Sequence, residues 1–302
     1  MTDPPDPPEG TISWRELLAE TTDHLSQAGV EQPALEARWI IETVTGLDGA
    51  ELVLGLDEPA TVRGVARLDA LIARRRDGEP IQYVLGSWGF RRLDLLCDPR
   101  ALIPRPETEQ VVEVALAELD SVLAGRPAPH RAVAVDLGTG TGAIALSVAV
   151  ERPGTEVWAV ERSSEALAVA RANLAGLGMA GTRVRLVEGS WFEPLPPDLC
   201  GTVDLVVTNP PYVAGHEVLP ASVADWEPVD ALVPGPSGLE AYGHLVVEAS
   251  RWLAPGGVFV AEIGFTQGAA VAALAADAGL TDIRVVRDHA DLDRTVVATR
   301  RH

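Results

Sequence analysis

Four consecutive residues, Asn209-Pro210-Pro211-Tyr212, have side chains that could hold a planar amino group. They follow the apolar run 203–208, which predicts a short buried strand. Because proline lacks the N–H that a strand ladder needs, the chain must leave the sheet there in a stiff turn. The Asn209 amide, nearby backbone carbonyls and the Tyr212 ring would then form a rigid corner. This corner predicts a seat for an NH₂ group, although an ordinary strand-ending turn would explain the same four residues.

A glycine-rich turn upstream is the second motif. The run 136–142, Asp-Leu-Gly-Thr-Gly-Thr-Gly, follows a predicted strand and opens directly into a predicted helix. Glycines let the backbone turn tightly and approach a ligand without side-chain obstruction. In open α/β sheets, such a turn after the first strand lies at the ligand-binding crevice. We therefore expect cofactor contacts from Gly138, Thr139, Gly140, Thr141 and Gly142.

Two residues after the next predicted strands extend this cofactor site. Glu161 ends its strand, where an acid can accept hydrogen bonds from both hydroxyls of an adenosine ribose. A surface glutamate at a strand end is the competing interpretation. Trp191 follows the third strand and offers a flat face to an adenine ring, although core packing explains it nearly as well.

The glycine spacing indicates which cofactor is expected. The pattern is Gly-x-Gly-x-Gly preceded by Asp136, whereas Gly-x-Gly-x-x-Gly supports a pyrophosphate at a helix N-terminus. S-adenosylmethionine has no phosphate to seat. The spacing therefore favours S-adenosylmethionine over a dinucleotide.

Alternating strands and helices from Ala132 onward predict an α/β fold, a parallel sheet with helices on both faces. The expected strands are Ala132–Asp136, Glu156–Val160, Arg183–Val187, Val203–Thr208, Val258–Ile263, Asp282–Val286 and Thr295–Thr299. The expected helices are Ala143–Val150, Ser164–Leu177, Gly238–Leu253 and Gln267–Ala278. The long loop 215–236 is typical of a lid or binding loop.

The residues before the sheet predict three different segments. Residues 1–10 are rich in Pro and Asp without apolar periodicity, which predicts a disordered tail. Residues 11–78 predict a small helical domain, starting at a capping box in which Ser13 precedes Glu16. Residues 79–103 predict a β-hairpin linker, formed by Pro80–Gly86 and Phe90–Leu96.

The composition predicts a globular protein and disfavours nucleic acid as its main partner. The chain has 302 residues, 47% of them hydrophobic, and a formal net charge of −20 without any lysine. Phosphate backbones are bound by basic surface, of which this chain has little. No apolar run is long enough to predict a membrane span, and Met1–Asp6 lack the pattern of a secretory signal. Two cysteines, Cys97 and Cys200, predict reduced thiols in the cytoplasm; we also expect a monomer without a metal site.

The two motifs together resemble the amino-group methyltransferases that use S-adenosylmethionine. More specifically, the chain resembles the peptide chain release factor glutamine methyltransferases, the PrmC/HemK family. Asn-Pro-Pro-Tyr is shared with nucleic-acid methyltransferases, so the combination with Pro104–Glu109 carries the finer assignment. The resemblance covers nearly the whole ordered chain, and its other matching stretches are Gly78–Tyr83, Leu102–Glu109 and Gly189–Phe192.

The resemblance implies a Rossmann-like, seven-stranded class I methyltransferase domain at residues 104–302, with the helical domain binding the release factor. It implies methyl transfer from S-adenosyl-L-methionine to the side-chain amide nitrogen of the glutamine in the Gly-Gly-Gln motif of class I release factors. Catalytic roles would fall to Asn209, Pro210 and Tyr212. The cofactor would contact Gly138 to Gly142, Glu161, Trp191 and Asn209, and the substrate glutamine would be bound by Asn209, Pro210, Pro211 and Tyr212.

Glu161 and one turn depart from the family pattern, and the role of Arg105 stays open. The family more often has aspartate at the position of Glu161, and the turn Trp88–Arg92 differs from the usual hairpin sequence. A helix start explains Pro106 and the acids after it, but it assigns no role to Arg105.

Other functions remain to be distinguished. The same Asn-Pro-Pro-Tyr corner could serve methylation of an adenine or guanine exocyclic amine in DNA or RNA, which the net charge of −20 disfavours. A non-catalytic adapter is disfavoured by the intact motif. An NAD-dependent dehydrogenase is disfavoured by the glycine spacing. A binding titration that compares NAD with S-adenosylmethionine would distinguish a dehydrogenase from a methyltransferase.

Overall fold

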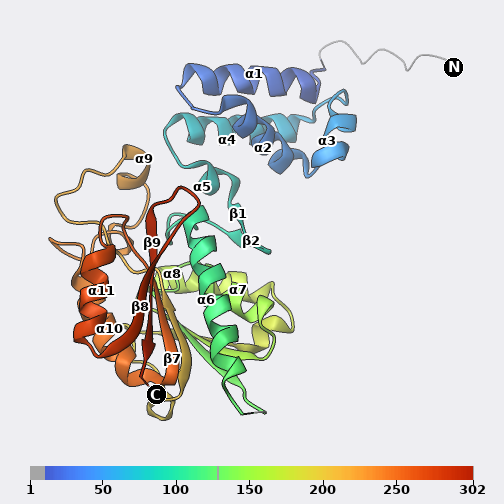
Figure 1. Cartoon of the computed structure of the whole chain (residues 1–302). Helices are drawn as coiled ribbons and strands as arrows, with labels where there is room; N and C mark the ends of the chain where they lie inside the picture. Colours follow the sequence, from blue (N-terminus) through green and yellow to red (C-terminus); the bar gives the residue numbers. More distant parts are fainter. Residues whose placement is uncertain (1–10, 128, 302) are drawn as a thin grey trace. The chain divides into compact units, whose positions relative to one another are not determined.

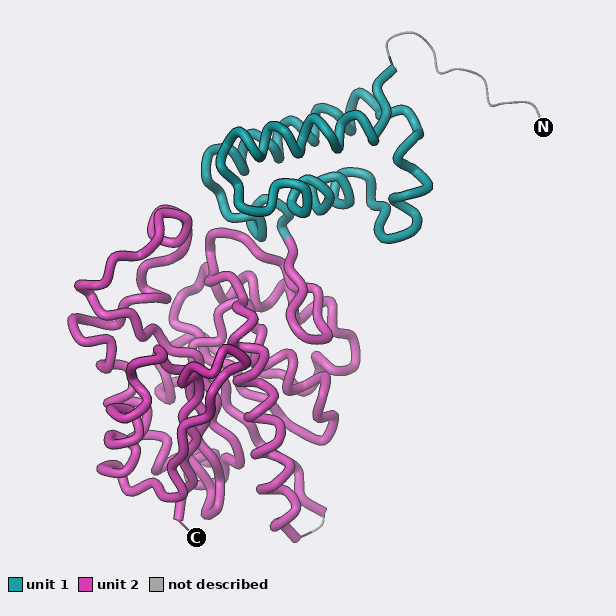
Figure 2. The backbone as a smooth tube through the Cα atoms, turned by 45° about the horizontal axis from the view of Figure 1, so that its top comes forward, with its two compact units in different colours: residues 1–86 teal, residues 87–302 magenta. Residues whose placement is uncertain are grey.

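The computed structural model describes residues 11–127 and 129–301, so the tail expected at residues 1–10 lies outside the described residues. Figure 1 shows helices in the first part of the chain and a helix-flanked sheet in the second. The chain divides into two compact units, Met1–Gly86 and Ser87–His302, drawn in teal and magenta in Figure 2. The division after Gly86 falls inside the stretch expected as a linker. The finer domain limits stay predictions.

The first unit is helical. It contains α1 (Trp14–Gln27), α2 (Pro33–Thr45), α3 (Gly49–Gly55), α4 (Val62–Arg76) and α5 (Ile81–Leu85). The predicted capping box is present: the Ser13 hydroxyl accepts from the Glu16 amide at 3.3 Å, and the Glu16 carboxylate accepts from the Ser13 amide at 2.8 Å. The longer helices each bury apolar side chains, among them Leu25, Ile40 and Leu68.

The segment Pro80–Gly86 corrects the predicted hairpin, because it forms helix α5 and not a strand. Arg74 explains the difference. Its guanidinium pairs with Glu79 at 2.7 Å and donates to the carbonyls of Tyr83 at 2.8 Å and Val84 at 3.2 Å. The last carbonyls of a helix have no partner inside the helix. The arginine therefore satisfies these carbonyls and stabilises the helical turn.

The hairpin itself exists but begins later. Strand β1 (Ser87–Phe90) pairs antiparallel with β2 (Leu93–Leu96). Arg91 lies in the turn between them with a positive φ of 51°. Its guanidinium pairs with Glu151 at 2.7 Å and donates to the Glu109 carbonyl at 2.8 Å. These bonds attach the unusual turn to the two helices that carry the glutamates.

The second unit contains the predicted sheet and its helices. The strands are β3 (Ala132–Leu137), β4 (Thr155–Glu161), β5 (Val184–Glu188), β6 (Val203–Thr208), β7 (Leu253–Glu262), β8 (Leu280–Arg287) and β9 (Asp293–Arg300). The α-helices are α6 (Pro106–Ala124), α7 (Ala143–Glu151), α8 (Ser164–Ala175), α9 (Ala221–Ala224), α10 (Glu240–Trp252) and α11 (Gly268–Asp277). Short 3₁₀ turns lie at η1 (Ala180–Arg183), η2 (Pro197–Leu199) and η3 (Val229–Ala231). Each predicted strand is present, with limits shifted by a few residues.

The strand order of the sheet is β5-β4-β3-β6-β7-β9-β8. The pairs from β5 to β7 are parallel, whereas β9 runs antiparallel to both of its neighbours. The chain builds outward from β3 to β5 and then returns to place β6 on the other side of β3. This reversal creates a switch point between β3 and β6, where open α/β sheets bind ligands.

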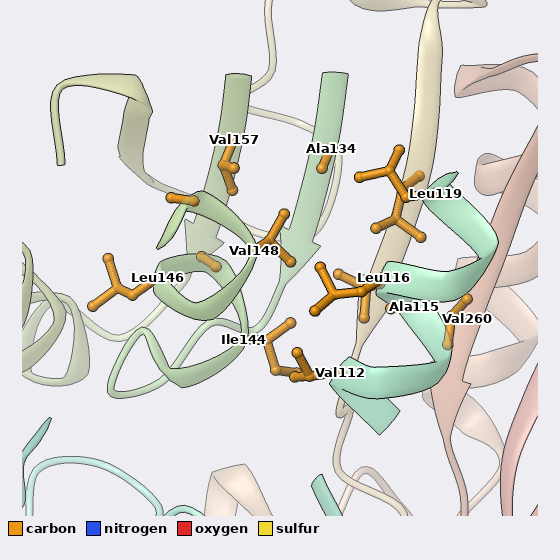
Figure 3. Packing of buried hydrophobic residues seen from close by; sticks show 14 of the residues in the cluster. Val112, Ala115, Leu116, Leu119, Ala134, Ile144, Leu146, Val148, Val157 and Val260 are labelled. Carbon is orange, nitrogen blue, oxygen red and sulfur yellow. The ribbon is translucent and has the colours of Figure 1, made fainter. Parts of the chain in front are cut away.

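The sheet is packed on both faces, as its continuous apolar strands require. Helices α6 and α7 cover one face and α10 and α11 the other. Figure 3 shows Val112 and Leu116 of α6 pointing toward Ile144 and Val148 of α7. These contacts fix the start of α6 and the start of α7 close to the switch point.

Leu119→Ala is expected to lower the free energy of unfolding by about 2–5 kcal/mol, the usual cost of a cavity left by a buried leucine. The Leu119 side chain is fully buried between α6 and the sheet. Val247→Ala, on the exposed side of α10, is the matched control and should change stability by less than about 0.5 kcal/mol. Urea unfolding followed by circular dichroism measures both; equal effects would contradict this packing.

Candidate active site

The two motifs meet at the switch point. In the register of the parallel pair β3–β6, Leu137 lies opposite Thr208, so the glycine turn and Asn209 leave the sheet side by side. A cavity of about 1080 Å³ opens there. Its lining includes these predicted site residues: Gly138, Thr139, Gly140, Thr141, Glu161, Trp191, Asn209 and Pro211. Within the described part of the chain, Gly142, Pro210 and Tyr212 do not belong to this lining.

The glycine turn needs its glycines for conformation. Gly138, Gly140 and Gly142 have positive φ angles of 74°, 56° and 89°. Residues with a side chain adopt such angles only with strain. Gly142 is the N-cap of α7, and a Cβ there would meet the Leu146 side chain at 3.0 Å. Gly142 therefore shapes the turn without lining the cavity.

Asp136 supports the turn from inside the sheet. Its carboxylate is fully buried and accepts from the Thr139 hydroxyl at 2.6 Å and the Ala145 amide at 3.1 Å. Burial raises the pKa of Asp136 to about 7, although both hydrogen bonds favour the ionised form. The residue thus joins β3, the turn and the start of α7.

Glu161 is positioned by backbone amides on both of its carboxylate oxygens. One oxygen accepts from Gly140 N–H at 2.9 Å and the other from Ser163 N–H at 2.9 Å. Each oxygen of an ionised carboxylate has a further lone pair. The side chain can therefore keep these bonds and still accept hydroxyl groups from a ligand in the cavity.

Trp191, expected to flank an adenine ring, follows β5 beside the cavity. It lies in the cavity wall and has a positive φ of 48°, which is unusual for a bulky residue. Its ring would be 3.7 Å from a Cβ placed on Gly138. The ring therefore lies against the glycine turn, where a flat ligand could stack on it.

The Asn209 side chain is held by groups that the sequence did not identify. Its Nδ2 donates to the Thr108 hydroxyl at 3.2 Å, and that hydroxyl donates to the Glu262 carboxylate at 2.6 Å. Thr108 lies in the first turn of α6 and Glu262 ends β7. Both are buried, with exposed fractions of 4% and 1%. The amide oxygen of Asn209 is directed away from Thr108.

Tyr212 lies behind Asn209 rather than in the cavity wall. Its hydroxyl donates to Glu262 at 3.4 Å, and its backbone carbonyl accepts from the side-chain Nε2 of Gln267 at 2.9 Å. Burial and the nearby Glu262 carboxylate raise the pKa of the Tyr212 phenol well above its usual value. Tyr212 is therefore a neutral hydrogen-bond donor in this structure.

The predicted long loop forms part of the cavity wall through the segment 228–234. Glu227, at its base, is buried and accepts from the Ile103 amide at 3.1 Å. It also forms an ion pair with the guanidinium of Arg105. Arg105, whose role the sequence left open, thus helps attach the loop to the residues before α6.

Glu227→Gln is expected to raise the dissociation constant of the predicted cofactor about tenfold. Without the ion pair, the loop segment 228–234 would complete the cavity wall in a smaller fraction of the molecules. Asp225→Asn is the matched control, since it makes the same acid-to-amide change at an exposed position two residues away. Calorimetric titration with S-adenosylmethionine measures both variants. Equal affinities would show that the ion pair does not shape the cavity.

The comparisons with known proteins give the family. Residues 16–86 match the model of the PrmC N-terminal domain, and residues 117–227 match the Methyltransferase small domain. The release factor glutamine methyltransferase of Caulobacter vibrioides is 39% identical over 96% of this chain and 97% of its own length. That of Gloeobacter violaceus is 41% identical over 94% of this chain and 95% of its own length. The chain belongs to the release factor glutamine methyltransferases.

The predicted family and fold class are therefore confirmed. A methyltransferase structure from Pyrococcus furiosus is 18% identical with a TM-score of 0.50, covering 79% of this chain and 98% of its own; this likeness shows the fold alone. Among residues 11–127 and 129–301, no helix is long and apolar enough to cross a membrane. The same residues contain no group of three or more His, Cys, Asp or Glu arranged to hold a metal ion.

S-adenosylmethionine, the cofactor expected for a methyltransferase, fits the residues of the cavity. The Gly140 amide, which a phosphate would need, already donates to Glu161. The Glu161 carboxylate would also repel a phosphate. A nucleoside without phosphate avoids both conflicts and can use the lone pairs of Glu161 and the face of Trp191.

Sequence reasoning missed Thr108, Glu227 and Glu262 as parts of the site. Thr108 lies inside the Pro104–Glu109 motif that carried the resemblance, so the motif contained a signal that was not assigned. Glu262 also had a signal, an acid near the end of an otherwise apolar predicted strand. Glu227 lies in a long loop without regular apolar periodicity, where its burial leaves no mark in the sequence.

Proposed function

We propose that this protein transfers a methyl group from S-adenosyl-L-methionine to the side-chain amide nitrogen of a glutamine in class I peptide chain release factors, within their Gly-Gly-Gln motif. One observation carries the proposal: the Asn209 amide lies in the same cavity as the glycine turn, with its nitrogen bonded to Thr108 and its oxygen directed elsewhere. An acceptor is thus available for the NH₂ group of the substrate.

The corner formed by Asn209 and Pro210 would orient the substrate. An amide nitrogen is a poor nucleophile because its lone pair is delocalised into the carbonyl. If the Asn209 oxygen and the Pro210 carbonyl each accept one N–H, the plane of the NH₂ group is fixed and its remaining electron density faces the cofactor pocket. Such positioning can lower a barrier by roughly 7–11 kcal/mol. Pro211, in the cavity wall, would restrict the glutamine side chain.

S-adenosylmethionine supplies, when bound, a methyl group activated by its sulfonium. Gly138 to Thr141 would leave room for it, Glu161 would accept its ribose hydroxyls, and Trp191 would cover one face of its adenine. Alkylation acidifies the substrate nitrogen, so the proton can leave to solvent without a dedicated base. Tyr212, neutral and buried, would support the corner from behind and exclude water there.

The wider setting follows from the same proposal. We propose that residues 11–78 bind the release factor, with a linker at 79–103 leading to the methyltransferase domain at 104–302. The protein would act as a monomer in the cytoplasm without direct nucleic-acid contact, for which the net charge of −20 is the support. Light scattering of the purified protein measures the oligomeric state.

Incubation with labelled cofactor, a purified release factor and bulk tRNA in parallel reactions tests the proposed function. We expect label in the release factor and none in RNA. A release factor whose Gly-Gly-Gln glutamine is replaced by alanine is the control substrate and should remain unlabelled. Label in nucleic acid would support the alternative amine substrate, and label in neither would contradict both.

A further inference from the structure

A chain of three polar side chains connects the buried end of β7 to the cavity. Glu262 accepts from the Thr108 hydroxyl at 2.6 Å, and that hydroxyl faces the Asn209 amide nitrogen at 3.2 Å. The three residues come from different elements: the end of β7, the first turn of α6 and the turn after β6. Thr108 and Asn209 both lie in the cavity wall, whereas Glu262 lies behind them.

Counting protons determines the direction of this chain. An ionised carboxylate only accepts, and a threonine hydroxyl has a single hydrogen to donate. The hydrogen of Thr108 goes to Glu262, the stronger and closer acceptor. The Thr108 oxygen then has only lone pairs left for Asn209, so the amide must present its NH₂ group to Thr108. The Asn209 oxygen is thereby directed away from Thr108.

Protonation of Glu262 would reverse this order. A protonated carboxyl can donate its hydrogen to the Thr108 oxygen, which frees the Thr108 hydrogen to point at Asn209. The amide would then turn over to offer its oxygen to Thr108 and its NH₂ group to the cavity. Two NH₂ groups would face each other when a substrate amide is present, and neither can accept.

We propose that Thr108 and Glu262 are positioning residues for methyl transfer, which hold the Asn209 amide with its oxygen free for the substrate as long as Glu262 is ionised. The inference rests on the proposed function and deepens it. It assigns a role to two side chains that need not contact either the cofactor or the glutamine.

The surroundings of Glu262 make its ionisation sensitive to pH near neutrality. Burial, helped by the nearby Glu107 carboxylate in the first turn of α6, raises the pKa of Glu262 to about 7. Arg294 of β9 and the hydroxyls of Thr108 and Tyr212 oppose this rise. The Tyr242 hydroxyl of α10 donates to the backbone carbonyl of Glu262 at 2.7 Å and leaves the carboxylate to the other groups.

The sign of the expected pH dependence follows. As the pH falls below the pKa of about 7, the ionised fraction of Glu262 falls, and kcat should fall roughly tenfold per pH unit. Asp136 has a raised pKa as well, but it contacts the glycine turn. Its titration is therefore read separately, from the cofactor affinity at each pH, and kcat is measured at saturating cofactor.

Variants of Thr108 test the relay, the hydrogen-bonded series from Glu262 through Thr108 to Asn209. Thr108→Val keeps the shape and removes the hydroxyl, and we expect kcat to fall about 10–100-fold with the cofactor dissociation constant unchanged within about twofold. Thr108→Ser keeps the hydroxyl and should retain kcat within about threefold. Thr155→Val is the matched control, because Thr155 is equally buried at the amino end of β4 and its hydroxyl has no partner among the described residues.

A double-mutant cycle separates positioning from a structural effect. Because Thr108 acts through Asn209, Thr108→Val should cost less than about twofold in kcat when Asn209 is already alanine. Glu262→Gln cannot titrate, so its kcat should be independent of pH between about 6 and 8, in contrast to the unaltered protein.

The outcomes distinguish this inference from the proposed function. Absence of methyl transfer to a release factor by the unaltered protein would overturn the proposed function itself. Normal transfer together with a Thr108→Val variant as active as the Thr155→Val control would overturn the relay alone. So would equal losses from Thr108→Val in the presence and absence of the Asn209 side chain, or an unchanged pH profile in Glu262→Gln.

Discussion

Asn209→Ala is expected to lower kcat for methylation of a release factor by about 10²–10³, the usual effect of removing one preorganised polar group from an active site. In the proposed function, the Asn209 oxygen would accept from the substrate NH₂ group and orient it. Without it the amide can rotate away from the line of displacement, and this loss is felt at the transition state more than in binding. The loss should therefore appear in kcat at saturating release factor and saturating cofactor.

Two further measurements give this prediction its specificity. The Asn209 side chain is partly exposed in the cavity wall, so its removal should change the melting temperature by no more than a few degrees. The cofactor dissociation constant should change by less than about tenfold, since the glycine turn and Glu161 remain. A variant that keeps more than about a tenth of the unaltered kcat would mean that Asn209 does not orient the substrate.

Glu161→Ala is expected to weaken S-adenosylmethionine binding by about 10²-fold or more. A hydrogen bond to a charged group contributes about 1.5–3 kcal/mol, and Glu161 would accept two ribose hydroxyls. It also holds the Gly140 amide and the Ser163 amide, so the turn loses support in the variant. Calorimetric titration of the cofactor, with kcat measured at saturation, separates this loss from a loss of chemistry.

The chain provides a matched control for the Glu161 prediction. Glu188 lies opposite Glu161 in the β4–β5 register but is exposed and outside the cavity lining. Glu188→Ala should leave cofactor affinity within about twofold. Glu161→Asp, the residue more common in the family, should bind more tightly than Glu161→Ala because it restores a carboxylate. If Glu161→Ala and Glu188→Ala weakened S-adenosylmethionine binding equally, Glu161 would not be a cofactor-binding residue.

The sheet and the meeting of the two motifs could be predicted from the sequence, and the reason is physical. Parallel strands buried on both faces are continuous apolar runs, and glycine or proline marks where each run must end. The glycine turn after β3 and Pro210 after β6 therefore located the two strand ends that form the switch point. The Glu161 and Asn209 variants test whether the side chains predicted there bind cofactor and substrate.

The parts that the sequence did not predict depend on contacts between distant segments. Thr108 and Glu262 are joined by a hydrogen bond across 154 positions, and Ile103 and Glu227 across 124. Local pattern carries no information on such pairs. Helix α5 was missed for a related reason, since its last carbonyls are satisfied by Arg74, a residue of the preceding helix. In both cases a polar side chain supplied from elsewhere decides the local geometry.

The most direct test of the central claim is mass spectrometry of a release factor incubated with this protein and isotope-labelled S-adenosylmethionine. The account predicts one added methyl group on the peptide that contains Gly-Gly-Gln, located by fragmentation on the glutamine side chain, and addition at least about 100-fold slower with Asn209→Ala. A methyl group on any other residue, or an unmodified peptide at saturating cofactor, would contradict it.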